Sequence, residues 1–240
     1  MIQQNPAQIF KAKRRGLAET PDHRLHATFN FEDITDPPRH PFGILSILND
    51  ETLGAKQYVD RSLSANSVAM IIPLASAAEC QFTGGSAQVV VPGEAFTYFT
   101  SQNSTLSIRN PYDESPINYL YIVFSETVIS DTLLPERYLI AQADLTEKNC
   151  LHKLFDAILN SLSVHIGIYG GREEAYYSPS NMGNGVFAFV IAGAFEIQGR
   201  LLEERDGMAL WNTGEIEMEA LSENAILLLI EAPLNGMNPN

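Results

Sequence analysis

Histidine and cysteine are the side chains of this chain best suited to bind a metal or act as a nucleophile. They are His23, His26, His40, His152, His165, Cys80 and Cys150. A metal or catalytic site needs several such groups to converge. His23 and His26 are three residues apart on a strand-like segment, so their side chains point to opposite faces. The two cysteines are far apart in the sequence, which argues against a disulfide framework and a thiolate metal site.

Other polar motifs give no stronger catalytic signal. Ser62 and Ser64 have no histidine nearby, so a hydrolase triad is not supported. Gly170-Gly171-Arg172 lacks the strand–loop–helix setting of a phosphate-binding loop and predicts a turn. Residue types and spacing therefore predict no catalytic residue, no metal ligand and no cofactor.

The acidic composition limits the partners of the chain. Lys and Arg number 15 against 29 Asp and Glu, which gives a net charge of −14 over 240 residues. Such a field repels nucleic-acid phosphates and anionic membrane surfaces. Residues 1–20 lack the apolar core of a signal peptide, and no apolar run approaches the roughly 20 residues of a membrane-spanning helix. We therefore predict a soluble, cytoplasmic protein with no nucleic-acid or membrane partner.

The clearest structural pattern lies in residues 185–233. Ile216, Met218 and Ala220 alternate with glutamates, which is typical of a strand with one buried and one solvated face. Residues 225–230 are apolar throughout and predict a strand buried on both faces. Residues 77–124 repeat this order of short strands and glycine turns without repeating the sequence. The chain is therefore predicted to be all-β, with two copies of one antiparallel barrel.

The segments outside these blocks are less regular. Residues 1–24 predict a loose arm, and residues 42–48 predict a strand that ends at an Asn49-Asp50-Glu51 turn. Between the blocks, apolar residues at helical spacing predict one short amphipathic linker helix: Leu151, Leu154, Phe155, Ile158, Leu159 and Leu162. We place an N-terminal domain in residues 1–142 and a C-terminal domain in residues 143–240.

Several stretches resemble the pirin-like bicupins. They are HATFNF at residues 26–31, FGILSILNDE at 42–51 and FAFVIAGAFEIQGRLLEERDGMALWN at 187–212. The resemblance implies two jelly-roll barrels joined by the linker. It also implies a metal site in the N-terminal barrel, where a His-x-His pair and a later His-x-Glu pair bind a transition metal such as iron. Some members are described as quercetin 2,3-dioxygenases and others as transcriptional co-regulators.

This chain departs from that metal-binding pattern at every ligand. Counted from Asn49-Asp50-Glu51, the His-x-His pair falls on Ser62-Leu63-Ser64. Counted from Pro92-Gly93, the His-x-Glu pair falls on Leu106-Ser107-Ile108. Because no histidine lies between His40 and His152, a register shift of one or two residues supplies none. Leucine and isoleucine cannot bind a metal, and serine hydroxyls are poor ligands of iron.

Two hypotheses follow from the resemblance and its departures. In the first, the chain is a metal-free pirin-like bicupin that binds a small molecule or a protein partner and is not an enzyme. Ser62, Ser64, Arg109 and Tyr121 are then predicted to line a cavity in the first barrel. The alternative is a metal-dependent oxidoreductase of the quercetin 2,3-dioxygenase type with an atypical site that includes His165 or residues outside the expected loop. A metal-independent isomerase or a sugar-binding cupin is a third interpretation, and the oligomeric state is left open.

Overall fold

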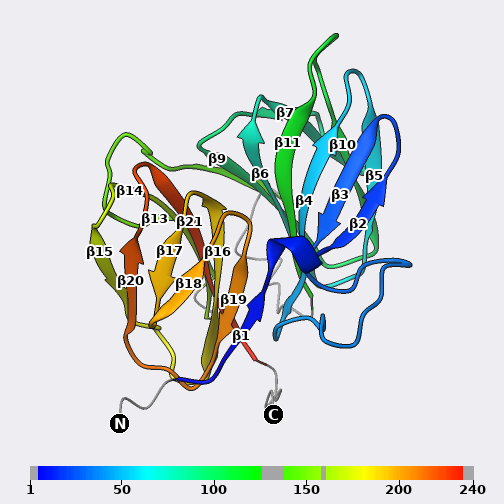
Figure 1. Cartoon of the computed structure of the whole chain (residues 1–240). Helices are drawn as coiled ribbons and strands as arrows, with labels where there is room; N and C mark the ends of the chain where they lie inside the picture. Colours follow the sequence, from blue (N-terminus) through cyan, green and yellow to red (C-terminus); the bar gives the residue numbers. More distant parts are fainter. Residues whose placement is uncertain (1–4, 126–137, 158–160, 235–240) are drawn as a thin grey trace. The chain divides into compact units, whose positions relative to one another are not determined.

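A computed structural model describes residues 5–125, 138–157 and 161–234. Apart from one short 3-10 turn, η1 (Ala12–Arg14), the regular structure in these ranges is antiparallel β-sheet. None of the described residues form a helix long and apolar enough to cross a membrane. The chain divides into an N-terminal unit, residues 16–142, and a C-terminal unit that combines residues 143–240 with the segment up to Arg15 (Figure 1).

The N-terminal unit consists of two sheets around one apolar core. The larger sheet has the order β12 (Tyr138–Gln142), β9 (Glu94–Thr100), β6 (Ser67–Ala75), β11 (Ile117–Phe124), β4 (Leu45–Leu53), β3 (His23–Ala27) and β2 (Gly16–Glu19). The smaller sheet has the order β5 (Tyr58–Leu63), β10 (Ser104–Arg109), β7 (Ala78–Phe82) and β8 (Gln88–Val90).

The C-terminal unit is built in the same way. Its larger sheet has the order β1 (Ala7–Phe10), β19 (Gly207–Leu210), β16 (Asn184–Ala192), β21 (Ala225–Pro233), β14 (Leu162–Tyr169) and β13 (His152–Ala157). Its smaller sheet has the order β15 (Glu174–Tyr177), β20 (Ile216–Ala220), β17 (Phe195–Ile197) and β18 (Arg200–Leu202).

The strand orders of the two units match. The run β9-β6-β11-β4 in one unit corresponds to β19-β16-β21-β14 in the other, and β5-β10-β7-β8 corresponds to β15-β20-β17-β18. The residue patterns explain the layers. On β20, Ile216 and Met218 are buried while Glu217 is exposed, and β21 is buried along nearly its whole length. The predicted all-β architecture of two repeated antiparallel barrels is confirmed.

The predicted linker helix is wrong over the residues that the structure describes. His152–Ala157 forms strand β13, which pairs with β14, and Ile158 and Leu159 lie outside the described residues. The register shifts between Lys153 and Phe155. Such a bulge places two consecutive residues against one on the partner strand, so Leu154 and Phe155 are both buried. Two adjacent buried residues, three positions after Leu151, match the i, i+3, i+4 spacing of a helix and so led to the wrong prediction.

The N-terminal segment is also more ordered than predicted. Residues 7–10 form β1, which pairs with β19 from Ala7↔Leu210 to Phe10↔Gly207. Lys11 Nζ lies 2.7 Å from Asp206 Oδ2. Residues 5–15, which we expected in the N-terminal domain, therefore belong to the C-terminal unit. The partner strand lies about two hundred residues away in the sequence, so no local pattern indicated it.

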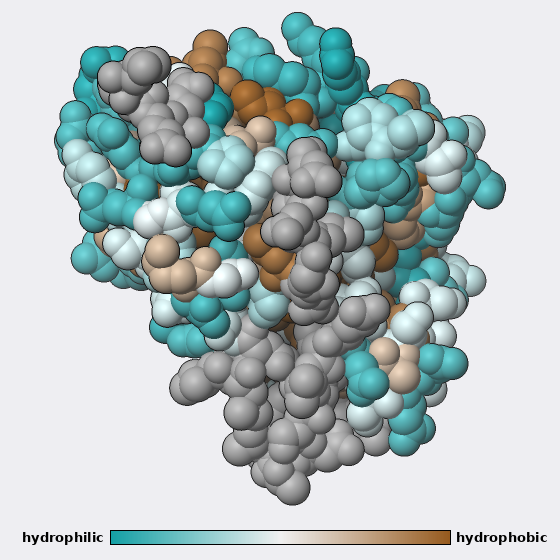
Figure 2. Space-filling view, turned by 90° about the horizontal axis from the view of Figure 1, so that it is seen from below, coloured by the Kyte–Doolittle hydropathy of each residue, from teal (hydrophilic) through white to brown (hydrophobic). Residues whose placement is uncertain are grey.

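The predicted turn at Asn49-Asp50-Glu51 is wrong as well. All three residues lie inside β4 and are buried. Polar residues of this kind favour turns when no partner is available, but here Asp50 accepts a hydrogen bond from Asn118, and Glu51 accepts from Arg61 and Tyr119. Elsewhere, hydrophilic side chains cover much of the face in Figure 2, with apolar residues in small groups.

Candidate functional site

The four side chains predicted to line a cavity do not converge on one site. Ser62 and Arg109 lie on the outer face of the smaller sheet and are exposed, and Ser64 is exposed just after β5. Tyr121, on β11, is 1% exposed and belongs to the apolar core. Arg109 forms an ion pair with Glu79, with 3.6 Å between Nε and Oε1. Only the two serines lie together, at a pocket described below.

The residues of β5 and β10 that point into the N-terminal unit are buried: Arg61, Leu63, Leu106 and Ile108. The register places Leu106 opposite Arg61. Because side chains alternate along a strand, the inward positions on β5 are one residue away from Ser62 and Ser64. A guanidinium and three aliphatic side chains provide no metal ligand. The donor set of this strand pair therefore does not fit the transition metal that the resemblance implies.

A buried carboxylate, Glu51, occupies the interior instead. Glu51 lies on β4 and is 0% exposed. Arg61 Nη2 donates to Glu51 Oε2 at 2.7 Å, and the Tyr119 hydroxyl donates to the same oxygen at 2.9 Å. His23 Nε2 lies 3.1 Å from it. These contacts bring together side chains from β3, β4, β5 and β11, and so join the two sheets of the unit.

The ionisation of Glu51 follows from its surroundings. Burial alone raises the pKa of a carboxyl, but the hydrogen bond with His23 and the charge and hydrogen bond of Arg61 outweigh it, so the pKa of Glu51 lies below its ordinary value. Burial, followed by the Glu51 charge, raises the pKa of the Tyr119 hydroxyl well above its ordinary value. The pair is therefore a carboxylate and a guanidinium, with Tyr119 as a neutral donor.

The guanidinium of Arg61 is enclosed by aromatic rings and a second acid. It lies over the rings of Phe31 and Tyr121, 5.2 and 5.6 Å from their centroids. Its Nη1 is 3.3 Å from Glu32 Oε1. Contacts of a guanidinium with aromatic faces are favourable where water is excluded. Glu51 and Arg61 therefore neutralise one another in the interior of the unit, and the mostly exposed Glu32 is a second acid beside the same guanidinium.

Sequence reasoning missed this cluster because Glu51 lies in an apparent turn. One signal was available on β5. Arg61 lies between Val59 and Leu63 at period two, which is the pattern of an inward-facing strand position. A buried arginine requires a carboxylate partner. That partner is Glu51 on β4, which lies opposite Tyr119 where β4 pairs with β11.

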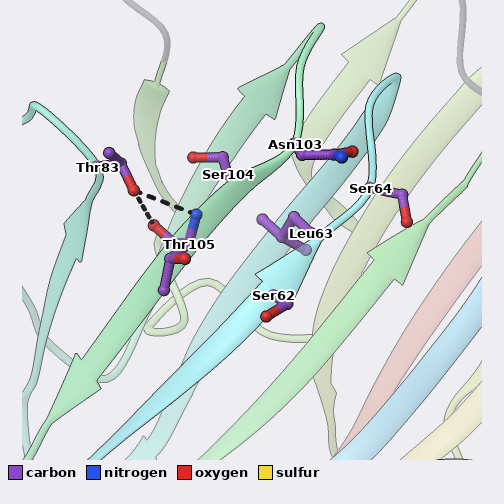
Figure 3. A pocket seen from close by; sticks show the side chains of 7 residues that line it. All are labelled: Ser62, Leu63, Ser64, Thr83, Asn103, Ser104 and Thr105. Carbon is purple, nitrogen blue, oxygen red and sulfur yellow. Dashed lines mark hydrogen bonds between the residues drawn. The ribbon is translucent and has the colours of Figure 1, made fainter.

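A polar pocket lies at the end of the smaller sheet of the same unit (Figure 3). Its volume is about 460 Å³, and its lining contains Ser62, Leu63, Ser64, Thr83, Asn103, Ser104 and Thr105. The lining has no charged side chain. We call this the polar pocket.

Part of the polar pocket's hydrogen-bonding capacity is used internally. The Thr83 hydroxyl donates to the Thr105 carbonyl (3.3 Å) and accepts from the Thr105 N–H (3.2 Å). Asn103 Oδ1 accepts from the Ala65 N–H at 3.0 Å. Within the described part of the chain, the hydroxyls of Ser62 and Ser64 and the Asn103 NH₂ group have no hydrogen-bond partner. These groups are available to a ligand.

His165, the histidine of the alternative hypothesis, lies on β14 of the C-terminal unit. Its ring makes an edge contact with Tyr177, with 5.5 Å between the centroids. Burial, followed by the charge of Lys153, lowers the pKa of His165. Among the residues that the structure describes, His165 does not belong to any group of three metal-binding side chains.

Comparison with known proteins extends these observations. A family model for the quercetinase C-terminal cupin domain matches residues 161–232. The quercetin 2,3-dioxygenase of Escherichia coli K12 is 24% identical over 232 residues, which cover 94% of this chain and 99% of that protein. The crystal structure of YhhW from Escherichia coli superposes with a TM-score of 0.84 at 20% identity, covering 97% of this chain and all of the other. A structure of bacterial pirin YhhW in complex with nickel(II) gives 0.83 at 19% identity, covering 95% and 100%.

Two repeated jelly-roll units in one chain define a bicupin. The C-terminal domain match and the full-length likeness go further: residues 161–232 match the quercetinase C-terminal cupin domain, and the whole chain is similar to pirin-like cupins.

Proposed function

We propose that this pirin-like bicupin binds an uncharged, hydroxyl-bearing small molecule in the polar pocket of its N-terminal unit, without a metal. The lining of the polar pocket carries the proposal. It consists of hydroxyl groups, one amide and one leucine, with no acidic or basic side chain. A charged ligand would find no counter-ion there, and the net charge of −14 disfavours anions further.

The available groups suit ligand hydroxyls in particular. The serine hydroxyls can both donate and accept a hydrogen bond, and the Asn103 NH₂ group donates two. A volume of about 460 Å³ lies in the range of small-molecule pockets. That size favours a small molecule over a protein partner.

The metal-free part of the proposal rests on the donor set. The inward positions of β5 and β10 carry Arg61, Leu63, Leu106 and Ile108, none of which binds a transition metal. A cytoplasmic location and the lack of nucleic-acid or membrane partners remain predictions from composition.

Ligand binding can be tested by titration calorimetry and ligand-observed NMR with two sets of probes, neutral mono- and disaccharides and flavonols. We expect at least one probe to bind with one site per chain. Asn103→Asp keeps the acceptor for the Ala65 N–H but removes both amide donors, so we expect affinity for that probe to fall about tenfold, the value of one net hydrogen bond of about 1.4 kcal/mol.

Ser62→Val and Ser107→Val form a matched pair for the same titration. Both serines lie on the outer face of the smaller sheet, but only Ser62 lines the polar pocket. Binding should weaken in Ser62→Val and stay unchanged in Ser107→Val. Equal losses in both variants, or no binding by either set of probes, would contradict the proposal.

The alternative activity has its own assay. The Escherichia coli relative is named a quercetin 2,3-dioxygenase, and a solved pirin structure contains nickel(II). Flavonol turnover should therefore be measured with added Ni²⁺, Fe²⁺, Cu²⁺ and Mn²⁺. We expect none. Turnover with any of these metals, or one tightly bound iron per chain after purification, would reject the metal-free interpretation.

A further inference from the structure

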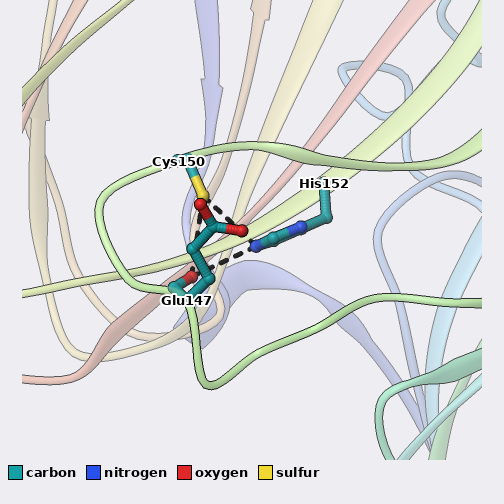
Figure 4. Close-up of side chains that lie close together, drawn as sticks. All are labelled: Glu147, Cys150 and His152. Carbon is teal, nitrogen blue, oxygen red and sulfur yellow. Dashed lines mark hydrogen bonds between the residues drawn. The ribbon is translucent and has the colours of Figure 1, made fainter.

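Three side chains of types that bind metals converge at the start of the C-terminal unit, away from the polar pocket. They are Glu147, Cys150 and His152, spaced as Glu-x₂-Cys-x-His (Figure 4). One ligand atom from each lies within 4.8 Å of the other two. All three side chains reach solvent: Glu147 is exposed, and the other two are half-buried. No other group of this kind occurs among the residues that the structure describes.

The backbone around the cluster is held in place by β14. Asn149 has a positive φ of 63°, its N–H donates to the Ile168 carbonyl at 2.7 Å, and its Oδ1 accepts from the Gly170 N–H at 2.8 Å. Gly167 faces the Cys150 carbonyl so closely that a Cβ there would lie 2.5 Å from the oxygen. His152 begins β13. The thiol and the imidazole are therefore positioned by paired strands and by a turn bonded to them.

The distances agree with a shared ion. Cys150 Sγ and His152 Nε2 are 3.3 Å apart. A tetrahedral Zn²⁺ with a Zn–S bond of about 2.3 Å and a Zn–N bond of about 2.0 Å separates these two atoms by about 3.5 Å. His152 Nε2 also lies 3.1 Å from the backbone carbonyl oxygen of Glu147, which holds the glutamate close to the imidazole ring.

The charges around the cluster favour a cation. Glu147 and the nearby Asp144 are both acidic, while the neighbouring Lys148 is directed to Glu223, with 3.0 Å between Nζ and Oε1. Asp144 Oδ1 accepts hydrogen bonds from the Thr146 N–H and hydroxyl, at 3.1 and 2.6 Å. The carboxylate of Glu147 has no ion pair within the described ranges.

We propose that Glu147, Cys150 and His152 form a Zn²⁺ site in the C-terminal unit. One thiolate, one imidazole and one carboxylate are a ligand set that zinc accepts, with water in the fourth position. On binding, the thiol loses its proton to solvent and the sulfur bonds to the ion. The bound ion cross-links the turn at residues 147–150 to the start of β13. The site shares no residue with the polar pocket, and the two proposals stand or fall separately.

The test uses the full chain after dialysis against a chelator. Titration with Zn²⁺ by calorimetry should give one ion per chain, and titration with Co²⁺ should produce a sulfur-to-cobalt charge-transfer absorption. Cys150→Ala should abolish that absorption and weaken Zn²⁺ binding by more than about 100-fold. Losing a ligand itself must cost more than the roughly 10–100-fold caused by losing one of its hydrogen-bond partners. His152→Ala should weaken Zn²⁺ binding by a similar factor.

Cys80→Ala and His165→Gln are the matched controls. Each removes the same type of side chain from a position outside the cluster, and each should leave the cobalt absorption and the zinc stoichiometry unchanged. The circular dichroism of every variant establishes that it is folded. The proposal is overturned if the chain binds no stoichiometric Zn²⁺, or if the Cys150 and His152 variants bind it as tightly as the parent.

Discussion

Glu51 and Glu231 are buried carboxylates in matching barrels, and they are kept ionised in different ways. Both are 0% exposed. Glu51 has a cationic partner, Arg61 on β5, at 2.7 Å. Glu231 on β21 has Tyr177 on β15, the strand that corresponds to β5, with 2.7 Å between the hydroxyl and Oε2. An arginine in one unit thus occupies the role that a tyrosine has in the other.

Glu231 makes up for the missing charge by the number of its donors. It accepts from the N–H groups of Ser180 and Asn181, from the Ser180 hydroxyl and from the Asn184 side chain, at 2.7 to 3.2 Å. Burial raises the pKa of Glu231. The hydrogen bonds from Ser180, Tyr177 and Asn184 lower it by more, so the pKa of Glu231 lies below its ordinary value. Hydrogen bonds can therefore replace a counter-charge in keeping a carboxylate ionised.

The difference predicts a larger cost of mutation in the charge-paired unit. Arg61→Met leaves the Glu51 charge buried without its cation, and we expect the free energy of unfolding of the N-terminal unit to fall by about 3–5 kcal/mol. Chemical denaturation followed by far-ultraviolet circular dichroism measures it. The double variant Arg61→Met/Glu51→Leu should recover most of the loss because no charge stays buried. A double variant as unstable as the single one would mean that Arg61 acts through packing.

Glu231→Gln tests the hydrogen-bonded carboxylate. The substitution replaces an oxygen that accepts hydrogen bonds by an NH₂ group facing other donors, but it leaves no buried charge. We expect a loss of about 2–3 kcal/mol in the C-terminal unit. Trp211, the single tryptophan of the chain, lies in that unit, so its fluorescence follows this transition. A loss as large as that of Arg61→Met would remove the distinction between the two environments.

Ser180→Ala should have a smaller effect on the same unit. It removes one donor, the hydroxyl 2.7 Å from Glu231 Oε1, and leaves the backbone N–H groups and Asn184 in place. We expect about 1 kcal/mol by the same fluorescence measurement. A loss equal to that of Glu231→Gln would show that the hydroxyl, and not the set of donors, holds the carboxylate.

The smallest expected effect is a difference between the units in their response to acid. The pKa of His165 is lowered from 6.5, so the folded C-terminal unit disfavours the protonated ring and loses stability as the pH falls below about 6.5. The lowered pKa values of Glu51 and Glu231 give stability that is present above about 4.5 and is lost only as the pH falls through their folded values. Between pH 6.5 and 4.5 the C-terminal unit should therefore weaken first.

Denaturation midpoints across this pH range test that order when Trp211 fluorescence, which follows the C-terminal unit, is compared with circular dichroism, which follows both units. In His165→Gln the early weakening should disappear, while the decline below about pH 4.5 should persist. An unchanged profile in this variant would exclude His165 as its cause.

The sequence predicted the strands well where burial alternates locally. Ile216, Met218 and Ala220 set the faces of β20 within five residues, and the repeated order of strands and turns predicted two like barrels. The resemblance to pirin-like bicupins further predicted that each of the two barrels is a jelly-roll cupin domain. It also directed attention to β5 and β10, although the pleat places Arg61 and Leu63, not Ser62 and Ser64, toward the interior.

Features that depend on distant partners could not be predicted in this way. Glu51 is held inside a strand by Arg61, His23 and Tyr119, which lie on three other strands and 10 to 68 residues away in the sequence. The bulge at Leu154 gave two adjacent buried residues and imitated a helix. The polar pocket joins residues 62–64 with residues 103–105 and Thr83, a closeness set by strand pairing and not by spacing.

The pairing of β1 with β19 has a consequence for how the chain is made. Ala7 lies opposite Leu210, so β1 finds its partner strand only after about two hundred further residues have been synthesised. Until then the edge of β1 is unpaired and must be kept from other strands. A fragment that begins at residue 143 would in turn expose the edge of β19. Within this sequence, β1 therefore precedes every other strand of the C-terminal unit but pairs with a strand made about two hundred residues later.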